Sequence, residues 1–136
     1  MTNLTTLASQ IHADNRAKGF WANPRPLTET TMLIVTELAE AVEEERAGNA
    51  GLYYRDVPSN EVVLFGDTYV GQDGLVRTKH RTSAPLKPEG IDIELVDALI
   101  RLLDLLGSRD VDVDELLKQK LAYNREGRGY SHGKAY

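Results

Sequence analysis

The chain has 136 residues, which suits one domain that hides roughly two-thirds of its unfolded surface on folding. Its 41% hydrophobic and 27% charged residues are typical of a globular protein and exclude a fibrous or disordered one. The formal net charge of −5 disfavours stable nucleic-acid binding, which depends on clustered Lys and Arg side chains.

The absence of cysteine and of long apolar segments indicates in which cellular compartment the protein is expected. The chain has no Cys, which excludes disulfides, thiolate metal ligands and a Cys nucleophile. No apolar run approaches the roughly 18 residues of a membrane span, and the first residues lack the basic and apolar parts of a signal peptide. We therefore expect a cytoplasmic protein with no membrane partner.

The first predicted element is a helix from Asn3 to Lys18, in which apolar residues recur at helical spacing and a glycine follows the last basic residue. The next segment, Phe20–Pro26, contains two prolines and is predicted to be a structured loop. It includes the bulky aromatic residue Trp21, which needs a pocket or a ligand.

The second predicted helix begins with a Thr28 cap and stops near Gly48. Its apolar residues form one arc at about 100° per residue, and Glu37, Glu40 and Glu44 lie beside that arc. These carboxylates therefore flank the core and do not oppose it.

Residues 51–90 differ in character from the rest. β-Branched and aromatic residues gather in Glu61–Phe65, Thr68–Val70 and Leu75–Thr78, with glycine-containing turns between them. We predict a small antiparallel hairpin or meander, followed by a linker at Ala84–Pro88. Because two or three short strands are marginally stable alone, the stretch is interpreted as an insertion in a helical body.

Two helices complete the chain. One runs from Ile91 to Leu106 and ends at Gly107, and the other starts after an Asp112 cap and runs to about Arg125. The predicted fold class is therefore all-α: a single domain, 1–136, formed by a four-helix bundle with the inserted β-hairpin or meander between helices two and three.

Two pairs of carboxylates need explanation. Glu37 with Glu40 and Glu94 with Asp97 are each three residues apart on a helix, a spacing that puts both members on one face. A solvated helix surface is the ordinary explanation of such acidic residues. Two converging pairs would repel each other unless a cation lay between them, and Mg²⁺, or alternatively Mn²⁺, is a hard ion that prefers oxygen ligands.

Cations that suit a phosphate substrate lie later in the chain. Lys120 and Arg125 are close to Asn124 on the fourth helix, and a basic, glycine-rich tail follows. Arg101, one turn after Asp97, could contact a phosphate or neutralise that carboxylate. A solvated helix end explains the later cations equally well, because the helix dipole favours positive charge there.

With these features in view, the sequence resembles the MazG-like superfamily of nucleoside triphosphate pyrophosphohydrolases, and within it the dCTP pyrophosphatase branch most. The matching segments are Glu37-Leu-Ala-Glu40, Glu94-Leu-Val-Asp97, Lys120-Leu-Ala-Tyr-Asn124-Arg125 and Tyr130-Ser-His-Gly-Lys134. The resemblance extends over about two-thirds of the chain and leaves out residues 51–90.

The resemblance implies Mg²⁺-dependent cleavage of a nucleoside triphosphate between its α and β phosphates, which releases a monophosphate and pyrophosphate. Glu37, Glu40, Glu94 and Asp97 would ligate the metal, and Glu37 or Glu40 would also position or deprotonate the attacking water. Members of the family assemble as dimers or dimers of dimers, so a homodimer or homotetramer is implied.

The resemblance also implies a substrate site. Lys120, Asn124 and Arg125 would contact phosphates or sugar, and His12 and Trp21 fall where the dCTP pyrophosphatase branch has a His and a Trp near the base. Two departures leave the substrate open: the long insertion, and an arginine at position 101 where that branch often has an aromatic residue.

Two other functions remain open. One is phosphoribosyl-ATP pyrophosphohydrolysis, a related reaction of the same family. The other is a non-catalytic helical interaction module whose acidic residues are solvated or bind a basic partner.

Overall fold

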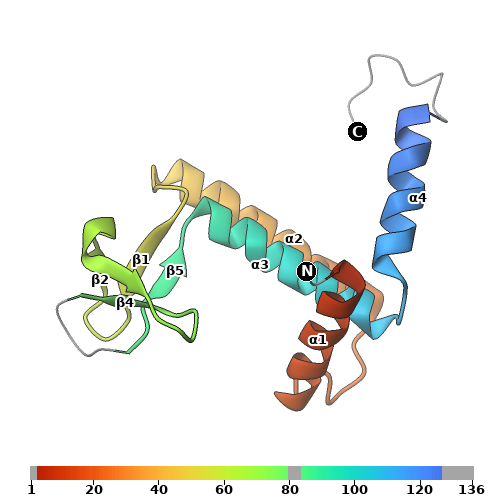
Figure 1. Cartoon of the computed structure of the whole chain (residues 1–136), viewed down its shortest axis with the longest axis horizontal. Helices are drawn as coiled ribbons and strands as arrows, with labels where there is room; N and C mark the ends of the chain where they lie inside the picture. Colours follow the sequence, from red (N-terminus) through yellow and green to blue (C-terminus); the bar gives the residue numbers. More distant parts are fainter. Residues whose placement is uncertain (1–2, 80–83, 127–136) are drawn as a thin grey trace. The chain divides into compact units, whose positions relative to one another are not determined.

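The computed structural model of the chain describes residues 3–79 and 84–126 (Figure 1). Two helices, α1 (Leu4–Ala17) and α2 (Leu27–Arg46), precede the strands, and two more, α3 (Ile91–Ser108) and α4 (Val113–Glu126), follow them. The strands are β1 (Tyr53–Asp56), β2 (Glu61–Val63), β3 (Thr68–Val70), β4 (Val76–Thr78) and β5 (Lys87–Glu89). None of the helices in these ranges combines the length and apolar content needed to cross a bilayer.

The chain forms two compact units. The first contains α1, the part of α3 from Ile100 onward, and α4. The second spans Leu27–Leu99 and contains α2, the strands and the beginning of α3. The helix α3 therefore belongs partly to each unit.

A small apolar core holds the first unit together. Ala8, Leu103 and Val113 are buried, and partly buried apolar residues pack against them: Leu4, Ile11, Leu106 and Val111. These seven residues come from α1, α3, α4 and the turn before α4, so this core joins all three helices of the unit.

The helix boundaries confirm the predicted cap at Asp112, add a cap at Asn3 that was not predicted, and differ from the prediction at two other positions. Asn3 caps α1 through a 2.8 Å bond from the Thr6 amide, and Asp112 accepts a 3.0 Å bond from the Glu115 amide at the start of α4. The predicted cap at Thr28 is wrong, because α2 begins directly after Pro26 and Thr28 lies in its first turn. Gly107 does not end α3, which continues to Ser108.

The predicted all-α fold class is wrong. The second unit contains two antiparallel sheets, one with strand order β2-β1-β5 and one formed by β3 and β4, so the protein is a mixed α/β fold and not a pure four-helix bundle. The paired strands β3 and β4 confirm that the insertion has antiparallel structure, but β1 and β5 were not predicted.

The missed strand β5 has a physical explanation. It contains Pro88, which has no N–H and so weakens the local sequence signal for a strand. The predicted linker Ala84–Pro88 therefore overlaps the first two residues of β5. A proline is tolerated in a strand at the edge of a sheet, and β5 is the outer partner of β1. The predicted strand Glu61–Phe65 is also too long, because Phe65 begins a short 3₁₀ helix.

Candidate metal centre

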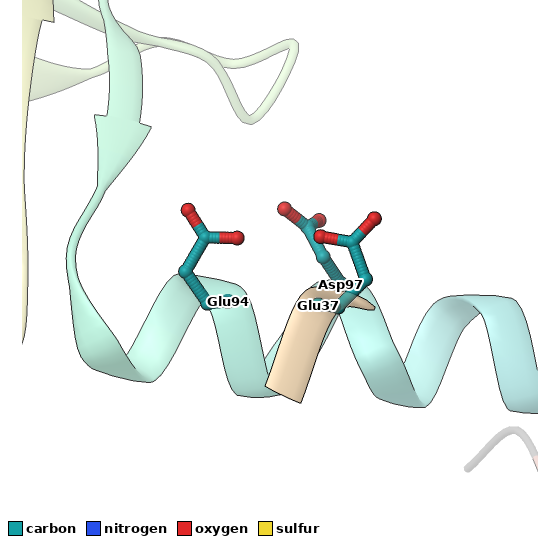
Figure 2. Close-up of side chains that lie close together, drawn as sticks. All are labelled: Glu37, Glu94 and Asp97. Carbon is teal, nitrogen blue, oxygen red and sulfur yellow. The ribbon is translucent and has the colours of Figure 1, made fainter. Parts of the chain in front are cut away.

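Three carboxylates from two helices of the second unit converge. Glu37 comes from α2, and Glu94 and Asp97 come from α3, which lies beside α2. One carboxylate oxygen of each lies within 4.8 Å of the other two. Figure 2 shows the three side chains directed to the same side of the helix pair. The structure therefore brings together one member of the first predicted pair and both members of the second.

Two small residues next to these carboxylates along the helices are buried. Ala41 follows Glu37 by one turn of α2 and Ala98 follows Asp97 in α3, and both alanines are buried. Glu37 itself is buried, with only 8% of its surface exposed. A carboxylate is costly to bury unless it is paired or coordinated, which makes a buried glutamate at this position unusual.

Glu40, the remaining predicted ligand, is exposed and lies outside this group of three. It is still close to the group, because its side chain forms a hydrogen bond with Glu94. Burial raises the pKa of Glu94 to about 7, and the bond to Glu40 and the negative charges of Glu40, Asp97 and Glu37 contribute further. Glu94 therefore binds a proton near neutral pH, where an ordinary glutamate is ionised.

An acidic depression of about 270 Å³ adjoins these carboxylates. It is lined by Glu40, Glu43, Glu44, Ala47, Asn49 and Glu94. Four of the six lining residues are glutamates, so the depression attracts cations.

Two of these glutamates have structural partners. Glu44 accepts bonds of 2.7 Å from Asn49 Nδ2 and 3.1 Å from Tyr53 Oη, which attach the end of α2 to β1. Glu43 forms a surface ion pair with Arg46 at 2.8 Å. Both residues therefore stabilise the end of α2, and the candidate metal centre consists of Glu37, Glu94 and Asp97, with Glu40 at its edge.

The donor set fits a hard divalent cation. Within residues 3–79 and 84–126, all the converging side-chain donors are carboxylate oxygens, which Mg²⁺ and Mn²⁺ prefer over the nitrogen and sulfur ligands that favour softer metals. A cation would also relieve the repulsion that raises the pKa of Glu94.

The other predicted site residues belong to the first unit. His12 on α1 and Trp21 in the following loop both bond to the carboxylate of Asp104 on α3, at 2.8 Å and 3.0 Å. Asn15 adds a third bond to Asp104 at 2.9 Å. The sequence did not predict this carboxylate, although its place at the polar margin of the third helix was visible.

The predicted phosphate-binding residues lie on α3 and α4. Lys120 Nζ is 5.2 Å from the centre of the Tyr123 ring, and Arg101 and Arg125 are exposed. Asn124 is half-buried, and its Oδ1 has no hydrogen-bond partner within residues 3–79 and 84–126. The basic tail, including Tyr130–Lys134, lies outside the residues that the structure describes.

Comparison with known proteins identifies no relative of this chain. No protein-family model, no curated protein and no solved structure matches the chain. Membership of the MazG-like superfamily therefore stays a prediction from the sequence motifs.

Proposed function

We propose that the protein is a Mg²⁺-dependent nucleoside triphosphate pyrophosphohydrolase that cleaves a (d)NTP between its α and β phosphates to a monophosphate and pyrophosphate. The convergence of Glu37, Glu94 and Asp97 from two helices is the observation that supports this proposal. A divalent cation at such a site supplies Lewis-acid activation of phosphate oxygens and of water. The resemblance of the same segments to the MazG-like motifs is the reason for proposing this particular reaction.

The carboxylates have distinct roles in this proposal. Glu37, Glu94 and Asp97 hold the cation, because their oxygens are close enough to share it. Glu40 is exposed and linked to Glu94, so it is suited to complete the ligand set or to orient and deprotonate the attacking water.

The substrate contacts follow from the resemblance. Lys120, Asn124, Arg125 and Arg101 would contact phosphates or sugar, because cationic and amide side chains bind phosphate oxygens. His12 and Trp21 would lie near the base. Such an enzyme would act on free nucleotides in the cytoplasm.

A homodimer or homotetramer is also proposed, and the surface of α2 supports it. Large apolar side chains of this helix are exposed, among them Met32, Val35, Leu38 and Val42. At 100° per residue they share the side of α2 opposite Glu37 and Glu40. A contiguous exposed apolar stripe of this kind is typical of a protein interface.

Pyrophosphate release tests the function. The purified protein is given the common ribo- and deoxyribonucleoside triphosphates and phosphoribosyl-ATP, with and without Mg²⁺. We expect turnover of at least one triphosphate only with Mg²⁺, and a loss of at least about a hundredfold in Glu37→Gln and Asp97→Asn. Glu45→Gln, an exposed change on the same helix, is the matched control and should keep wild-type activity. No turnover of any compound would contradict the proposal.

A non-catalytic acidic module is the second candidate, and the glutamate-lined depression favours it. Calorimetry distinguishes the two functions. Binding of a non-hydrolysable triphosphate that requires Mg²⁺ supports the enzyme, whereas binding of a basic peptide without any nucleotide binding supports the module.

A further inference from the structure

The three-stranded sheet of the second unit has two outer strands, β2 and β5 (Figure 1). Among the strands that the structure describes, each of the two pairs with a strand on one side only, and that strand is β1. The backbone N–H and C=O groups on the other side of an outer strand can pair with a strand of another chain. The two edges differ in how they are protected against such pairing.

The strand β5 carries residues that prevent edge-to-edge pairing. Lysine and proline are typical protecting residues of an edge strand, and β5 contains both, as Lys87 and Pro88. The side chain of Lys87 is 62% exposed, so its charge stays in solvent beside the edge. The strand β2, Glu61–Val63, contains neither lysine nor proline. It is therefore the less protected edge of this sheet.

Exposed apolar side chains lie on one face of β2. Val62 is 54% exposed, and Leu64, which continues the extended backbone with φ −66° and ψ 141°, is 74% exposed. Residues two apart in an extended strand point to the same face. In the edge strand β3 the exposed Tyr69 and Val70 are adjacent, so they point to opposite faces. Of these two strands, only β2 combines an unprotected edge with an apolar face.

Two copies of β2 are complementary to each other. An antiparallel pair related by a two-fold axis keeps the same face of both strands together, so the axis passes beside one residue of each strand. An axis at Glu61 would place two carboxylates opposite each other, and an axis at Val63 would place Glu61 opposite Phe65, which belongs to a 3₁₀ helix. An axis at Val62 avoids both problems, because Glu61 then lies opposite Val63. The exposed Val62 and Leu64 of the two copies form one apolar patch across this axis.

We propose that β2 pairs with β2 of a second copy of this chain, antiparallel and centred on Val62. This contact goes beyond the proposed nucleotide chemistry and is separate from the apolar stripe of α2. Two three-residue strands bury less surface than the roughly 1,000 Å² of a stable interface, so one such contact does not hold two chains together. Two contacts that act together are much stronger, so the pairing joins dimers formed through α2 into tetramers. The tetramer, but not the pairing itself, rests on the assembly through α2.

A single introduced cysteine tests the pairing directly, because the chain has no Cys of its own. Directly opposite residues of an antiparallel pair have Cα atoms about 4.5–5.5 Å apart, which is within the range of a disulfide. Val62→Cys should therefore form a disulfide-linked dimer on mild oxidation with diamide, read on a non-reducing gel. Val70→Cys, at an exposed valine of the edge strand β3, is the matched control and should stay largely unlinked. Equal linkage of the two variants would overturn the proposal.

A charge at the same position gives a second test. Val62→Lys would place two like charges directly opposite each other in the paired strands, which opposes pairing. The variant should sediment as a dimer held by α2, whereas the wild type and the control Val70→Lys should sediment as tetramers. Circular dichroism checks that both variants keep the fold, as expected for substitutions at exposed positions. A tetramer that survived Val62→Lys would contradict the proposal.

The strand pairing and the α2 assembly fail in different ways. If the wild type is monomeric, the assembly through α2 fails, and the two cysteine variants are oxidised again at about 1 mM protein, where a weak contact is populated. Stronger linkage of Val62→Cys than of Val70→Cys still supports the pairing, and equal linkage overturns it. None of these measurements depends on nucleotide hydrolysis, so a failure of the proposed enzymatic function is recognised separately.

Discussion

Gly107, inside α3, lies directly against the backbone of Ala8, inside α1. A Cβ at position 107 would overlap the Ala8 carbonyl oxygen and lie 2.9 Å from His12 Cβ. Glycine inside a helix is unfavourable by roughly 0.5–1 kcal/mol relative to alanine, so its presence here reflects the close approach of the two helices. Asp104 is one turn before Gly107, so the same approach brings Asp104 to His12.

Gly107→Ala should therefore destabilise the protein despite its better helix propensity. Overpacking of this kind costs about 1–3 kcal/mol, because the obstructing atoms belong to backbone and cannot rotate away. Urea denaturation measures the loss. Gly66→Ala is the matched control, since a Cβ at position 66 meets nothing within 4 Å, and its effect should stay within about 1 kcal/mol. Equal stability of the two variants would contradict this account of Gly107.

The same position shows what the sequence could and could not predict. Apolar periodicity identified all four helices, because it depends only on residues close in the chain. Whether Gly107 ends α3 or permits close packing depends on Ala8, which is far away in the sequence. Pro88 is similar: it weakens the local signal for a strand, and only its pairing partner β1 makes β5 an edge strand.

The candidate metal centre was also predicted only in part from the sequence. The i,i+3 spacing showed that Glu94 and Asp97 share a face of one helix. It could not show that Glu37 would join them as a buried residue while Glu40 stayed exposed, because that depends on how α2 rotates against α3. Asp104 was missed because its three donors are 83 to 92 residues away in the sequence.

A second prediction concerns the contact of α1 with α4. Asp114 accepts bonds from the Leu4 amide at 3.2 Å, the Thr5 amide at 2.8 Å and the Thr5 hydroxyl at 2.6 Å. These bonds, above all the one from the Thr5 hydroxyl, lower the pKa of Asp114. A lowered folded-state pKa means that the stabilisation is present above the ordinary Asp pKa of about 3.9 and is lost as the pH falls toward the lowered value.

Asp114→Asn should accordingly be less stable than the wild type at pH 7, and the difference should shrink below about pH 4. Urea midpoints measured across this range check the prediction. Asp14→Asn, an exposed change on α1, is the control and should have little effect at either pH. A wild-type advantage that persisted unchanged below pH 3 would exclude Asp114 as its source.

A third prediction concerns Glu94. Its folded-state pKa of about 7 lies above the ordinary 4.5, so the folded state binds the proton more tightly, and stability should fall as the pH rises through this window. Metal-free protein is therefore expected to melt at a lower temperature at pH 8 than at pH 5.5. Glu94→Gln should remove most of this slope.

Mg²⁺ should reverse the trend, because the cation and the proton compete for the same carboxylates. The melting temperature should rise more on addition of Mg²⁺ at pH 8 than at pH 5.5, and the rise should be absent in Asp97→Asn. Glu45→Gln should behave as the wild type. A Mg²⁺ effect that was the same at both pH values would argue against a cation at this cluster.

The last prediction concerns assembly through α2. Met32 is 60% exposed and Leu38 is also exposed, on the side of the helix away from Glu37. If a second copy covers this stripe, a charge placed in it must lose its hydration without gaining a partner, which is strongly unfavourable. The double variant Met32→Glu/Leu38→Glu should therefore sediment as a monomer while the wild type sediments as a dimer or tetramer. Gln10→Glu adds a charge at an exposed position of a different helix, α1, and should leave the oligomer intact. A monomeric wild type at every concentration tested would contradict the proposed assembly, and dissociation by Gln10→Glu alone would place the interface on α1.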